Sequence, residues 1–373
     1  DRFISQLAGN KRIDVEVCIA LRLALYQLIY LDKVPPYSAI NESVNLVQRA
    51  KKTSAKGFVN AVLRRATREK IEISFADEID RISVETSHPR WLIEKWVAEF
   101  GIDEASKVAV ANNEKPDIAF RLIGQSSEAV RSLADASRRS DHVDGCYVAE
   151  RGSSHLFNLS QIGEIYIQDE ASQMVAQAVE IPPLGLFLDV CAAPGGKTGL
   201  IAARNSAAAR LLAAGDLHWP RVEYLRDNCR KQGVDSVQIV QYDAERSLPF
   251  VDESFDSVLV DAPCSGTGTI RSNPEIRYFL RSEDFSELSK KQLAILMNAS
   301  KLVKSGGLLI YSTCSIEREE NEDVCGKFLA GNTEFESIRP NVSDGFITDN
   351  GFARTWPHRD RMDGFFIAAF RRN

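Results

Sequence analysis

Two cysteines stand in similar settings fifty residues apart. Cys264 lies in "DAPCSGTG", directly after a proline and downstream of the apolar run "FDSVLV", and Cys314 lies in "TCS" after the run "GLLIYS". A lone free cysteine usually packs as a small hydrophobic residue. These two instead occupy loops rich in serine, threonine and glycine, at the predicted ends of strands. Such positions favour a functional thiol over a structural one.

The segment "DVCAAPGGKT" also follows an apolar run and has the character of a ligand-binding loop. A phosphate-binding P-loop needs a glycine where Cys191 stands, and a dinucleotide fingerprint needs three spaced glycines where only Gly195 and Gly196 occur. The small residues of this loop let a ligand lie close to backbone amides instead. The spacing therefore argues against both nucleoside triphosphates and nicotinamide dinucleotides.

Acidic residues end the next two predicted strands. Asp216 closes "LLAAGD" and is placed to accept from a ribose diol, and Asp243 closes "VQIVQYD" and is placed to accept from an adenine amino group. Either one alone could be a loop or helix-capping residue. As a set without a pyrophosphate-binding device, they favour S-adenosylmethionine (SAM). The predicted cofactor-binding residues are Cys191, Ala192, Ala193, Pro194, Gly195, Gly196, Lys197, Asp216 and Asp243.

Three regions follow from the patterns along the chain of 373 residues. Apolar strands alternate with helices across residues 161–373, which predicts a Rossmann-like α/β catalytic domain whose mostly parallel sheet binds ligands at the carboxyl ends of its strands. Residues 73–160 predict a small α+β domain with the strands "DIAFRLI" and "GCYVAERG". Residues 1–72 predict an all-helical domain. Its segment "VEVCIALRLALYQLIYL" is apolar almost all round, so we expect a central helix packed on several sides.

Charge is distributed unevenly over these regions. The chain has a net charge of −6, yet residues 1–75 contain 13 Lys and Arg against 7 Asp and Glu, a balance of +6 that leaves −12 for the rest. A basic cluster of this kind attracts phosphates, and a solvated helix face is the alternative interpretation. Its members are Arg49, Lys51, Lys52, Lys56, Arg64, Arg65, Arg68 and Lys70.

Composition excludes several classes of protein. No apolar run approaches the roughly 18 residues of a membrane span. Seven cysteines without CxxC pairs or neighbouring histidines favour neither a disulfide framework nor a metal site, so we expect reduced thiols, a cytoplasmic location and no metal. The chain begins at Asp1 instead of a methionine, and we expect its natural start to lie upstream. The cysteines expected to be structural are Cys18, Cys146, Cys191, Cys229 and Cys325.

The motifs "DVCAAPGGKT", "DAPCSGTGTIRSNPE" and "YSTCSIEREEN" resemble those of the RNA cytosine-C5 methyltransferases of the Sun/RsmB type, and "DGFFIAAFRR" resembles that family's closing strand. Residues 15–68 resemble the NusB-like helical domain of the bacterial branch, with its first helices lacking, and "SHPRWLIEKWVAEFG" resembles its linker domain. The resemblance covers nearly the whole chain. It implies a SAM-dependent methyltransferase that acts on small-subunit (16S) ribosomal RNA.

The resemblance also implies roles for individual residues. Cytosine C5 becomes nucleophilic once a thiolate adds to C6, and in this RNA family the Thr-Cys motif carries that thiolate. Cys314 is then the nucleophile and Cys264 assists product release. Asp261 is expected to contact both the cofactor and the N3/N4 edge of cytosine. Lys197 is expected to approach the cofactor or to neutralise Asp261, and a lysine at a helix N-terminus without a functional role is the alternative interpretation.

The motifs leave other substrates and a non-catalytic role open. A DNA enzyme would use the cysteine after proline, Cys264, as its nucleophile, and a tRNA substrate or a non-catalytic NusB-like RNA-binding scaffold are further possibilities. Arg271 and Arg277 are candidates for contacts with RNA phosphates, with a solvated loop as the rival interpretation. The target base must leave its stack, which favours a loop or a single strand in deproteinised or early-assembly RNA. We expect no membrane partner and a monomer.

Overall fold

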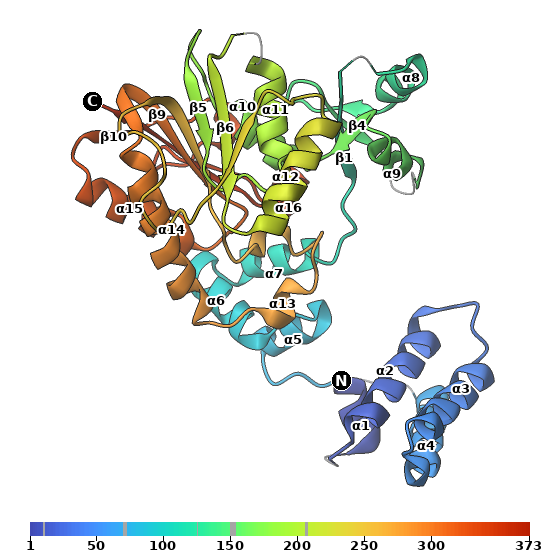
Figure 1. Ribbon diagram of the computed structural model, residues 1–373. Coiled ribbons are helices and arrows are strands. Elements are labelled where there is room, and N and C mark those ends of the chain that lie inside the picture. Colours follow the sequence, from blue (N-terminus) through green and yellow to red (C-terminus); the bar gives the residue numbers. More distant parts are fainter. Residues whose placement is uncertain (10–11, 70–72, 125, 150–153, 206–207) are drawn as a thin grey trace. The chain divides into compact units, whose positions relative to one another are not determined.

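The computed structural model describes residues 1–373 except 10–11, 70–72, 125, 150–153 and 206–207. The chain divides into two compact units, Asp1–Ser87 and His88–Asn373, and each is described by itself (Figure 1). Lys70 of the predicted basic cluster and the predicted boundary at residue 72 lie outside the described residues. Within the described residues, every helix is too short or too polar to traverse a lipid bilayer.

The first unit is helical, as predicted. Its core forms where Leu21 and Ala24 meet Val47 and Leu63, all of them fully buried. These residues recur at helical spacing on three different helices, so each helix contributes one apolar stripe. The elements are α1 (Arg2–Ala8), α2 (Val15–Tyr30), α3 (Pro36–Arg49), the 3₁₀ turn η1 (Thr53–Ala55), α4 (Lys56–Arg68) and α5 (Glu78–Thr86).

The expectation that residues 15–31 form a helix packed on several sides is wrong in one respect. The helix forms as α2, but Ile19, Leu23 and Tyr26 on one of its sides are about half exposed, at 48, 48 and 57%. Helices α3 and α4 pack against the side that carries Leu21 and Ala24. An apolar sequence all round a helix therefore does not ensure that neighbours cover every side.

The second unit begins with two helices and a small antiparallel sheet. Both predicted strands are confirmed as β1 and β3, and the sheet order is β2-β3-β1-β4. Strand β4 pairs with β1, so this sheet extends beyond residue 160, where we expected the catalytic domain to begin. The elements are α6 (Arg90–Phe100), α7 (Ile102–Ala111), β1 (Ile118–Leu122), α8 (Glu128–Ala136), β2 (Arg138–Arg139), β3 (Cys146–Ala149), α9 (Ser154–Gln161) and β4 (Ile165–Ile167).

The large sheet has the order β10-β12-β9-β8-β5-β6-β7, with β11 paired to β12. The four pairings among β9, β8, β5, β6 and β7 are parallel, and those of β12 are antiparallel. The strands are β5 (Leu186–Asp189), β6 (Leu211–Asp216), β7 (Gln238–Gln241), β8 (Phe255–Asp261), β9 (Val303–Thr313), β10 (Phe335–Ile338), β11 (Ala353–Arg354) and β12 (Phe366–Arg372). The helices and 3₁₀ turns are α10 (Glu170–Gln177), α11 (Gly196–Asn205), α12 (Trp219–Lys231), η2 (Thr267–Thr269), α13 (Ile276–Phe279), α14 (Asp284–Ser300), η3 (Arg318–Glu320), α15 (Glu322–Gly331), η4 (Asp344–Phe346) and α16 (Pro357–Asp360).

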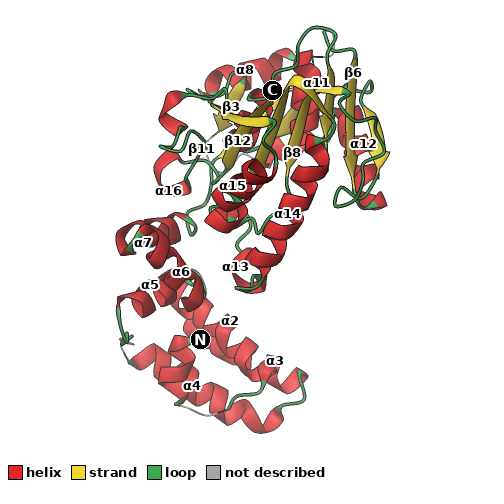
Figure 2. Cartoon of the chain, turned by 90° about the vertical axis from the view of Figure 1, so that its left-hand side faces the viewer, coloured by secondary structure: helices red, strands yellow, loops and turns green. Residues whose placement is uncertain are grey.

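Both faces of the large sheet are covered, which explains its near-continuous apolar strands. Phe187 and Leu259 belong to the core formed with α10, α11 and α12, whereas Leu188 and Val258 belong to the core formed with α14 and α15. Successive residues of β5 and β8 thus serve opposite faces, as the strand period requires. Figure 2 shows the sheet between these helices. The Rossmann-like fold predicted from the sequence is confirmed.

Gly268, in the loop that carries Cys264, lies in close contact with two other segments of backbone. Gly268 N donates to Cys314 O at 3.0 Å and Gly268 O accepts from Gly364 N at 2.8 Å. A Cβ at Gly268 would lie 1.9 Å from Gly364 O. We expect Gly268→Ala to lower the free energy of unfolding by about 3 kcal/mol, because a backbone segment must move, as measured by denaturant unfolding.

Gly326→Ala is the matched control. Gly326 lies in α15 with nothing within 4 Å of its Cβ position, so alanine should leave stability unchanged or raise it slightly. Equal stability of the Gly268→Ala protein and the wild type would contradict this prediction, because it would show that the segments at Gly268 and Gly364 can move apart at little cost.

Candidate active site

Acidic and sulfur side chains gather where the parallel strands end. Strands β5, β6 and β8 end at Asp189, Asp216 and Asp261, and β9 ends one residue before Cys314. The register of the sheet places Asp261 beside Ser312. Because parallel strands share their carboxyl edge, the loops that follow these residues line one site.

Cys264 and Cys314 lie next to each other in this site. Their Sγ atoms are 3.3 Å apart, and both side chains are partly buried. The hydrogen bond to Cys314, together with burial, raises the pKa of the Cys264 thiol well above its ordinary range. Cys264 therefore keeps its proton, and either sulfur can be the donor in the contact between the two thiols.

Four further cysteines have raised pKa values and are therefore less reactive. Burial raises the pKa of both Cys146 and Cys229 to about 12, so these thiols stay protonated. Burial also raises the pKa of Cys191 and Cys325 well above the ordinary value. A protonated thiol is a poor nucleophile, which fits the structural role expected for these four residues.

Lys197 lies against the carboxylate of Asp261. Its Nζ is 2.7 Å from Asp261 Oδ2, and the hydroxyl of Ser312 donates to Asp261 Oδ1 at 2.8 Å. Burial alone would lower the pKa of Lys197, but the charge of Asp261 outweighs it and the pKa is raised. Lys197 is thus an ammonium ion, and its field also reaches Cys314. The expected contact with Asp261 is confirmed, and the expected approach to the cofactor stays a prediction.

Helix α12 holds the cofactor loop in place. Asn228 Nδ2 donates to Pro194 O at 2.7 Å, and Gln232 Nε2 donates to Gly195 O at 3.2 Å. Gly195 has a φ of +101°, and a Cβ there would lie 2.9 Å from the Leu225 side chain. The glycine therefore permits both this backbone conformation and the close packing of α12.

The two acids expected to bind the adenosine moiety differ in their surroundings. Asp216 is buried, accepts from Ala193 N at 3.1 Å and pairs with Arg221 Nε at 3.1 Å. Asp243 follows the end of β7, is partly exposed, and pairs with Arg246 at 3.2 Å. Both carboxylates lie at the carboxyl edge as predicted, and their contacts with the cofactor remain predictions.

Asp189 is a site residue that sequence reasoning missed. It is buried at the end of β5, and its Oδ2 accepts from Thr198 Oγ1 at 2.6 Å. Its Oδ1 is buried without a hydrogen-bond partner among the described residues. Burial raises the pKa of Asp189 to about 7. The rule that singled out Asp216, an acid at a strand end, applies equally to Asp189.

These residues fit a cofactor that carries both an adenosine and an amino acid. Buried polar atoms normally have partners, so the orphaned Asp189 Oδ1 indicates a donor that arrives with a ligand. Asp189 would meet an ammonium group, and Asp216 and Asp243 would meet the ribose and adenine. Small residues 191–196 leave room for close approach.

Comparisons with known proteins agree with this geometry. Residues 177–371 match the family described as 16S rRNA methyltransferase RsmB/F, and residues 1–68 match the NusB family. The chain belongs to the RsmB/F family. It is therefore an RNA methyltransferase that uses SAM.

Curated relatives extend over nearly the whole chain. The chain is 34% identical over 374 residues to "Probable ribosomal RNA small subunit methyltransferase B" of Bacillus subtilis, covering 94% of this chain and 82% of the relative. It is 34% identical over 366 residues to "Ribosomal RNA small subunit methyltransferase B" of Pseudomonas putida, covering 96 and 83%.

Solved structures support the same fold. The crystal structure of PH0851 has a TM-score of 0.84 and 27% identity, covering 100% of this chain and 86% of that one. NSun6 from Pyrococcus horikoshii, solved with SFG, has a TM-score of 0.67 and 20% identity, covering 76 and 98%.

The two arginines expected to contact RNA phosphates do not face solvent in this RsmB/F chain. Arg271 has a side chain only 7% exposed and pairs with Asp363 at 2.7 Å and Asp169 at 3.2 Å. Arg277 is buried and donates to Asn113 Oδ1 at 2.8 Å and to Asn112 O at 3.2 Å. Both expectations are wrong because these guanidinium groups satisfy buried acceptors.

Three carboxylates near the Cys314 loop could suggest a metal site, but a lysine lies among them. Glu99, Glu317 and Glu319 bring carboxylate oxygens within 4.8 Å of one another. Lys95 Nζ is 2.8 Å from Glu319, 3.1 Å from Glu317 and 3.4 Å from Glu99. Trp96 Nε1 also donates to Glu317 at 3.0 Å. This cluster therefore fastens α6 to the loop.

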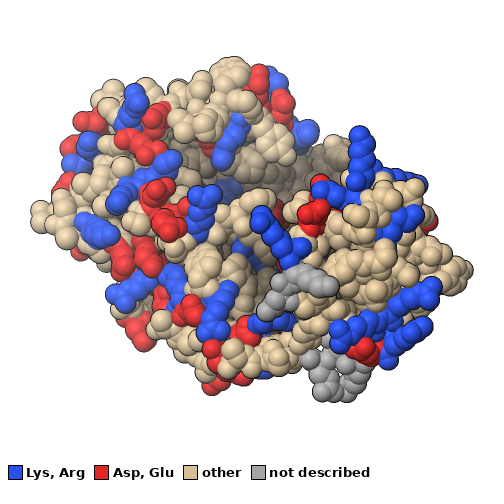
Figure 3. Space-filling view, turned by 90° about the horizontal axis from the view of Figure 1, so that it is seen from below, with Lys and Arg blue, Asp and Glu red and all other residues tan. Residues whose placement is uncertain are grey.

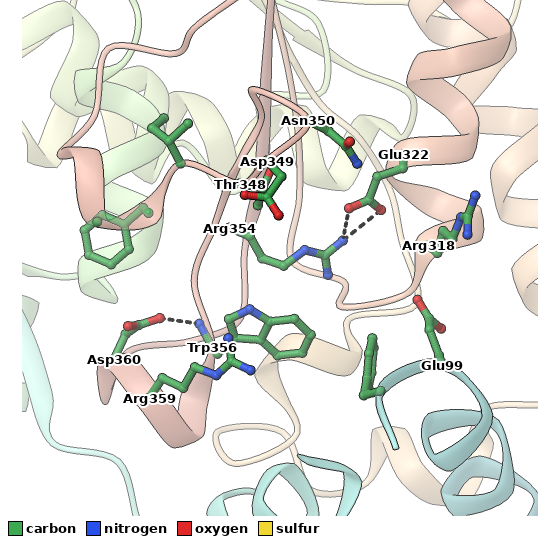
Figure 4. A pocket seen from close by; sticks show the side chains of 14 residues that line it. Glu99, Arg318, Glu322, Thr348, Asp349, Asn350, Arg354, Trp356, Arg359 and Asp360 are labelled. Carbon is green, nitrogen blue, oxygen red and sulfur yellow. Dashed lines mark hydrogen bonds and ion pairs between the residues drawn. The ribbon is translucent and has the colours of Figure 1, made fainter. Parts of the chain in front are cut away.

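A cavity of about 590 Å³ lies beside the same loop (Figure 4). Arg354 crosses it and makes two hydrogen bonds to Glu322, at 2.7 and 2.8 Å, and a third to Ile316 O at 2.8 Å. The Arg354 guanidinium also lies 5.1 Å from the ring centre of Trp356. These contacts brace the segment that follows Cys314.

Asp189 gives a pH-dependent prediction. Because its folded-state pKa is raised to about 7, the folded state binds more protons than the unfolded state between about pH 4 and pH 7. Its contribution to stability is therefore full at low pH and is lost as pH rises through 7. Asp189→Asn should become more stable relative to wild type by about 2 kcal/mol between pH 5 and pH 7.5, as followed by denaturant unfolding.

Asp256→Asn provides the opposite control. The hydrogen bonds and charge of its partners outweigh the effect of partial burial and lower the pKa of Asp256, so it favours the folded state at neutral pH. Its substitution should cost more at pH 7.5 than at pH 3. A stability difference for Asp189→Asn that does not change with pH would contradict the assigned burial effect.

Proposed function

We propose that this chain methylates C5 of a cytosine in small-subunit (16S) ribosomal RNA, with Cys314 as the nucleophile. The proposal rests chiefly on one observation: two thiols 3.3 Å apart at the strand ends, with a lysine–carboxylate pair beside them. The names of the RsmB/F family and of its relatives support the choice of RNA. The thiol pair supports cytosine-C5 chemistry, because one thiolate can add to C6 and the second thiol can assist its release.

The reaction begins with attack by Cys314. Its thiolate adds to C6 of an unstacked cytosine, a C–S bond forms, and the electron pair of the C5–C6 double bond becomes available at C5. Lys197 stabilises the thiolate before attack through its positive charge. Asp261, held by Lys197 and Ser312, accepts a hydrogen bond from the N4 amino group of the base, and from N3 once N3 takes up a proton during the addition. When bound, SAM supplies an electrophilic methyl group.

Product release reverses the addition. Water takes the C5 proton, the electron pair of the C5–H bond re-forms the C5–C6 double bond, and the bond between C6 and Cys314 breaks to return the thiolate. Cys264 lies one hydrogen bond away from the departing sulfur. We assign it to this second half of the reaction because its proton and sulfur are within reach of the breaking bond.

The helical unit supplies the general attraction for RNA. Its match to the NusB family supports this role. Arg65 pairs with Glu69, and Lys52 pairs with Asp14. Among the described residues, no acidic partner lies within ion-pair distance of Arg49, Lys51, Arg64 and Arg68. Figure 3 displays groups of Lys and Arg with few acids among them on this unit, at the right of the view.

The two cysteines give the test of the reaction. With unmodified small-subunit RNA and methyl-labelled SAM, Cys314→Ala should lower turnover by about 1,000-fold or more, because no C6 adduct forms. Cys264→Ala should instead accumulate a covalent protein–RNA adduct, since attack proceeds and release stalls. The adduct is measured by denaturing electrophoresis, and loss of tritium from cytidine labelled at C5 reports the position.

Cys325→Ala is the control, because that thiol is buried in the core away from the pair. Turnover by Cys314→Ala together with inactivity of Cys264→Ala would reverse the two roles, as in the DNA-type alternative. Faster methylation of transfer RNA or DNA than of small-subunit RNA would show that the proposed substrate is wrong. No labelling of any RNA would favour the scaffold.

The basic cluster gives a separate binding test. The triple variant Lys51→Glu, Arg64→Glu and Arg68→Glu should weaken RNA binding and reduce the slope of log affinity against log salt by about 2, as expected for the loss of three phosphate contacts. Filter binding at several salt concentrations measures both quantities. Lys301→Glu, Lys327→Glu and Arg339→Glu in the second unit change the net charge equally. If both triple variants weaken binding equally, the effect comes from net charge alone, and the cluster makes no specific contact with RNA.

A further inference from the structure

Glu320 is a buried acid that the reaction described above does not use. It is the last residue of η3 and lies six residues after Cys314, with an exposed fraction of 0%. A carboxylate in such a place is costly unless hydrogen-bond donors surround it. Its partners therefore indicate what it is for.

Four donors converge on the carboxylate. Oε1 accepts from Ser265 N at 2.9 Å and from Gln292 Nε2 at 2.9 Å. Oε2 accepts from the hydroxyls of Ser265 and Ser315. All four donors are uncharged, so hydrogen bonds stabilise this acid in place of an ion pair.

These donors belong to the two cysteine loops. Ser265 directly follows Cys264, and Ser315 directly follows Cys314. Gln292 of α14 also donates to Pro263 O at 2.9 Å, on the other side of Cys264. The Glu320 side chain thus binds Ser265, next to Cys264, and Ser315, next to Cys314. The hydroxyls of Ser265 and Ser315 also contact each other, at 3.1 Å.

The position of the carboxylate also matters for charge. Glu320 is among the groups whose charge raises the pKa of Cys264, whereas Lys197 lies on the side of Cys314. The two thiols thus interact electrostatically with a buried acid and a buried ammonium group. Any movement of one loop would separate the two sulfurs and alter this arrangement.

We propose that Glu320 is a positioning residue that clamps the Cys264 and Cys314 loops together through Ser265 and Ser315, so that the two sulfurs stay in contact. The inference rests on the proposed function, because the contact matters only if both thiols act on one base. It concerns geometry first: the clamp sets the distance between the sulfurs before RNA or SAM binds.

The hydrogen-bond pattern makes a sharp distinction between two variants. In Glu320→Gln, the amide oxygen can take the place of Oε1 and accept from Ser265 N and Gln292 Nε2. The amide nitrogen can take the place of Oε2 and donate to the two serine hydroxyls, since a hydroxyl both donates and accepts. Glutamine can therefore keep the clamp without its charge. Alanine cannot keep any of the four bonds.

A trivalent arsenical reports the distance between the thiols without RNA or SAM. Phenylarsine oxide condenses with two adjacent thiols, forming two As–S bonds and releasing one water. The full chain, wild type and variants, is incubated with one equivalent of the reagent, and peptide mass spectrometry locates the bridge. Methyl transfer and SAM affinity are measured on the same preparations.

Wild type and Glu320→Gln should form the Cys264–Cys314 bridge at similar rates and differ in kcat by no more than about threefold. Glu320→Ala should form the bridge at least about tenfold more slowly, and its kcat should fall about 100-fold with the KM values for RNA and SAM little changed, because misplacement of reacting groups acts on the chemical step. Glu319→Gln is the matched control, since Glu319 is adjacent, half exposed and bonded to Lys95. It should behave as wild type.

Rapid bridging and normal kcat in Glu320→Ala would overturn the proposal, as would loss of bridging in Glu320→Gln. If Glu320→Ala does not fold, shown by lost SAM binding, the double variant Ser265→Ala and Ser315→Ala decides by the same measurements. Failure of the proposed function is separate: wild type would then bridge the arsenical normally but transfer no methyl group to cytosine C5.

Discussion

The parallel pairing of β8 with β9 is the constraint on which the active site depends. Its register sets Asp261 beside Ser312, so the loops that follow the two strands leave the sheet side by side. A shift of one residue would move one loop by about 3.3 Å along the strand, a distance equal to the separation of the two sulfurs. The chemistry of the cysteine pair is therefore a consequence of sheet register, supported by the hydrogen bonds of Glu320.

Buried charge is arranged unevenly around this site. Lys197 offsets Asp261, Arg271 offsets Asp169 and Asp363, and Lys95 offsets the acids of the Cys314 loop. Burial raises the pKa of Asp363 to about 7 even so. Many cations of the second unit thus serve its interior. The basic cluster of the helical unit, for which we propose the attraction of phosphates, lies apart from these buried pairs.

Sequence patterns predicted the sheet and the gathering of Cys264, Cys314 and Asp261 at its carboxyl edge, because both depend on local signals. Apolar runs followed by glycine loops predict strand ends, and strand ends in a parallel sheet share one edge. Asp189 was not among the predicted site residues, although it also ends a parallel strand. Arg271 and Arg277 were misassigned because a loop arginine has the same appearance in sequence whether its guanidinium meets water or a buried acceptor from a residue far along the chain.

Contiguous residues specify the order of the elements, the two thiols, the glycine loop after β5 and the family to which they belong. Only the tertiary structure decided that the sulfurs touch, that Lys197 faces Asp261 and that Glu320 joins both loops. It also decided that one side of α2 is exposed. These facts depend on register and on contacts between residues distant in the chain, and hydrophobic periodicity carries no information about either.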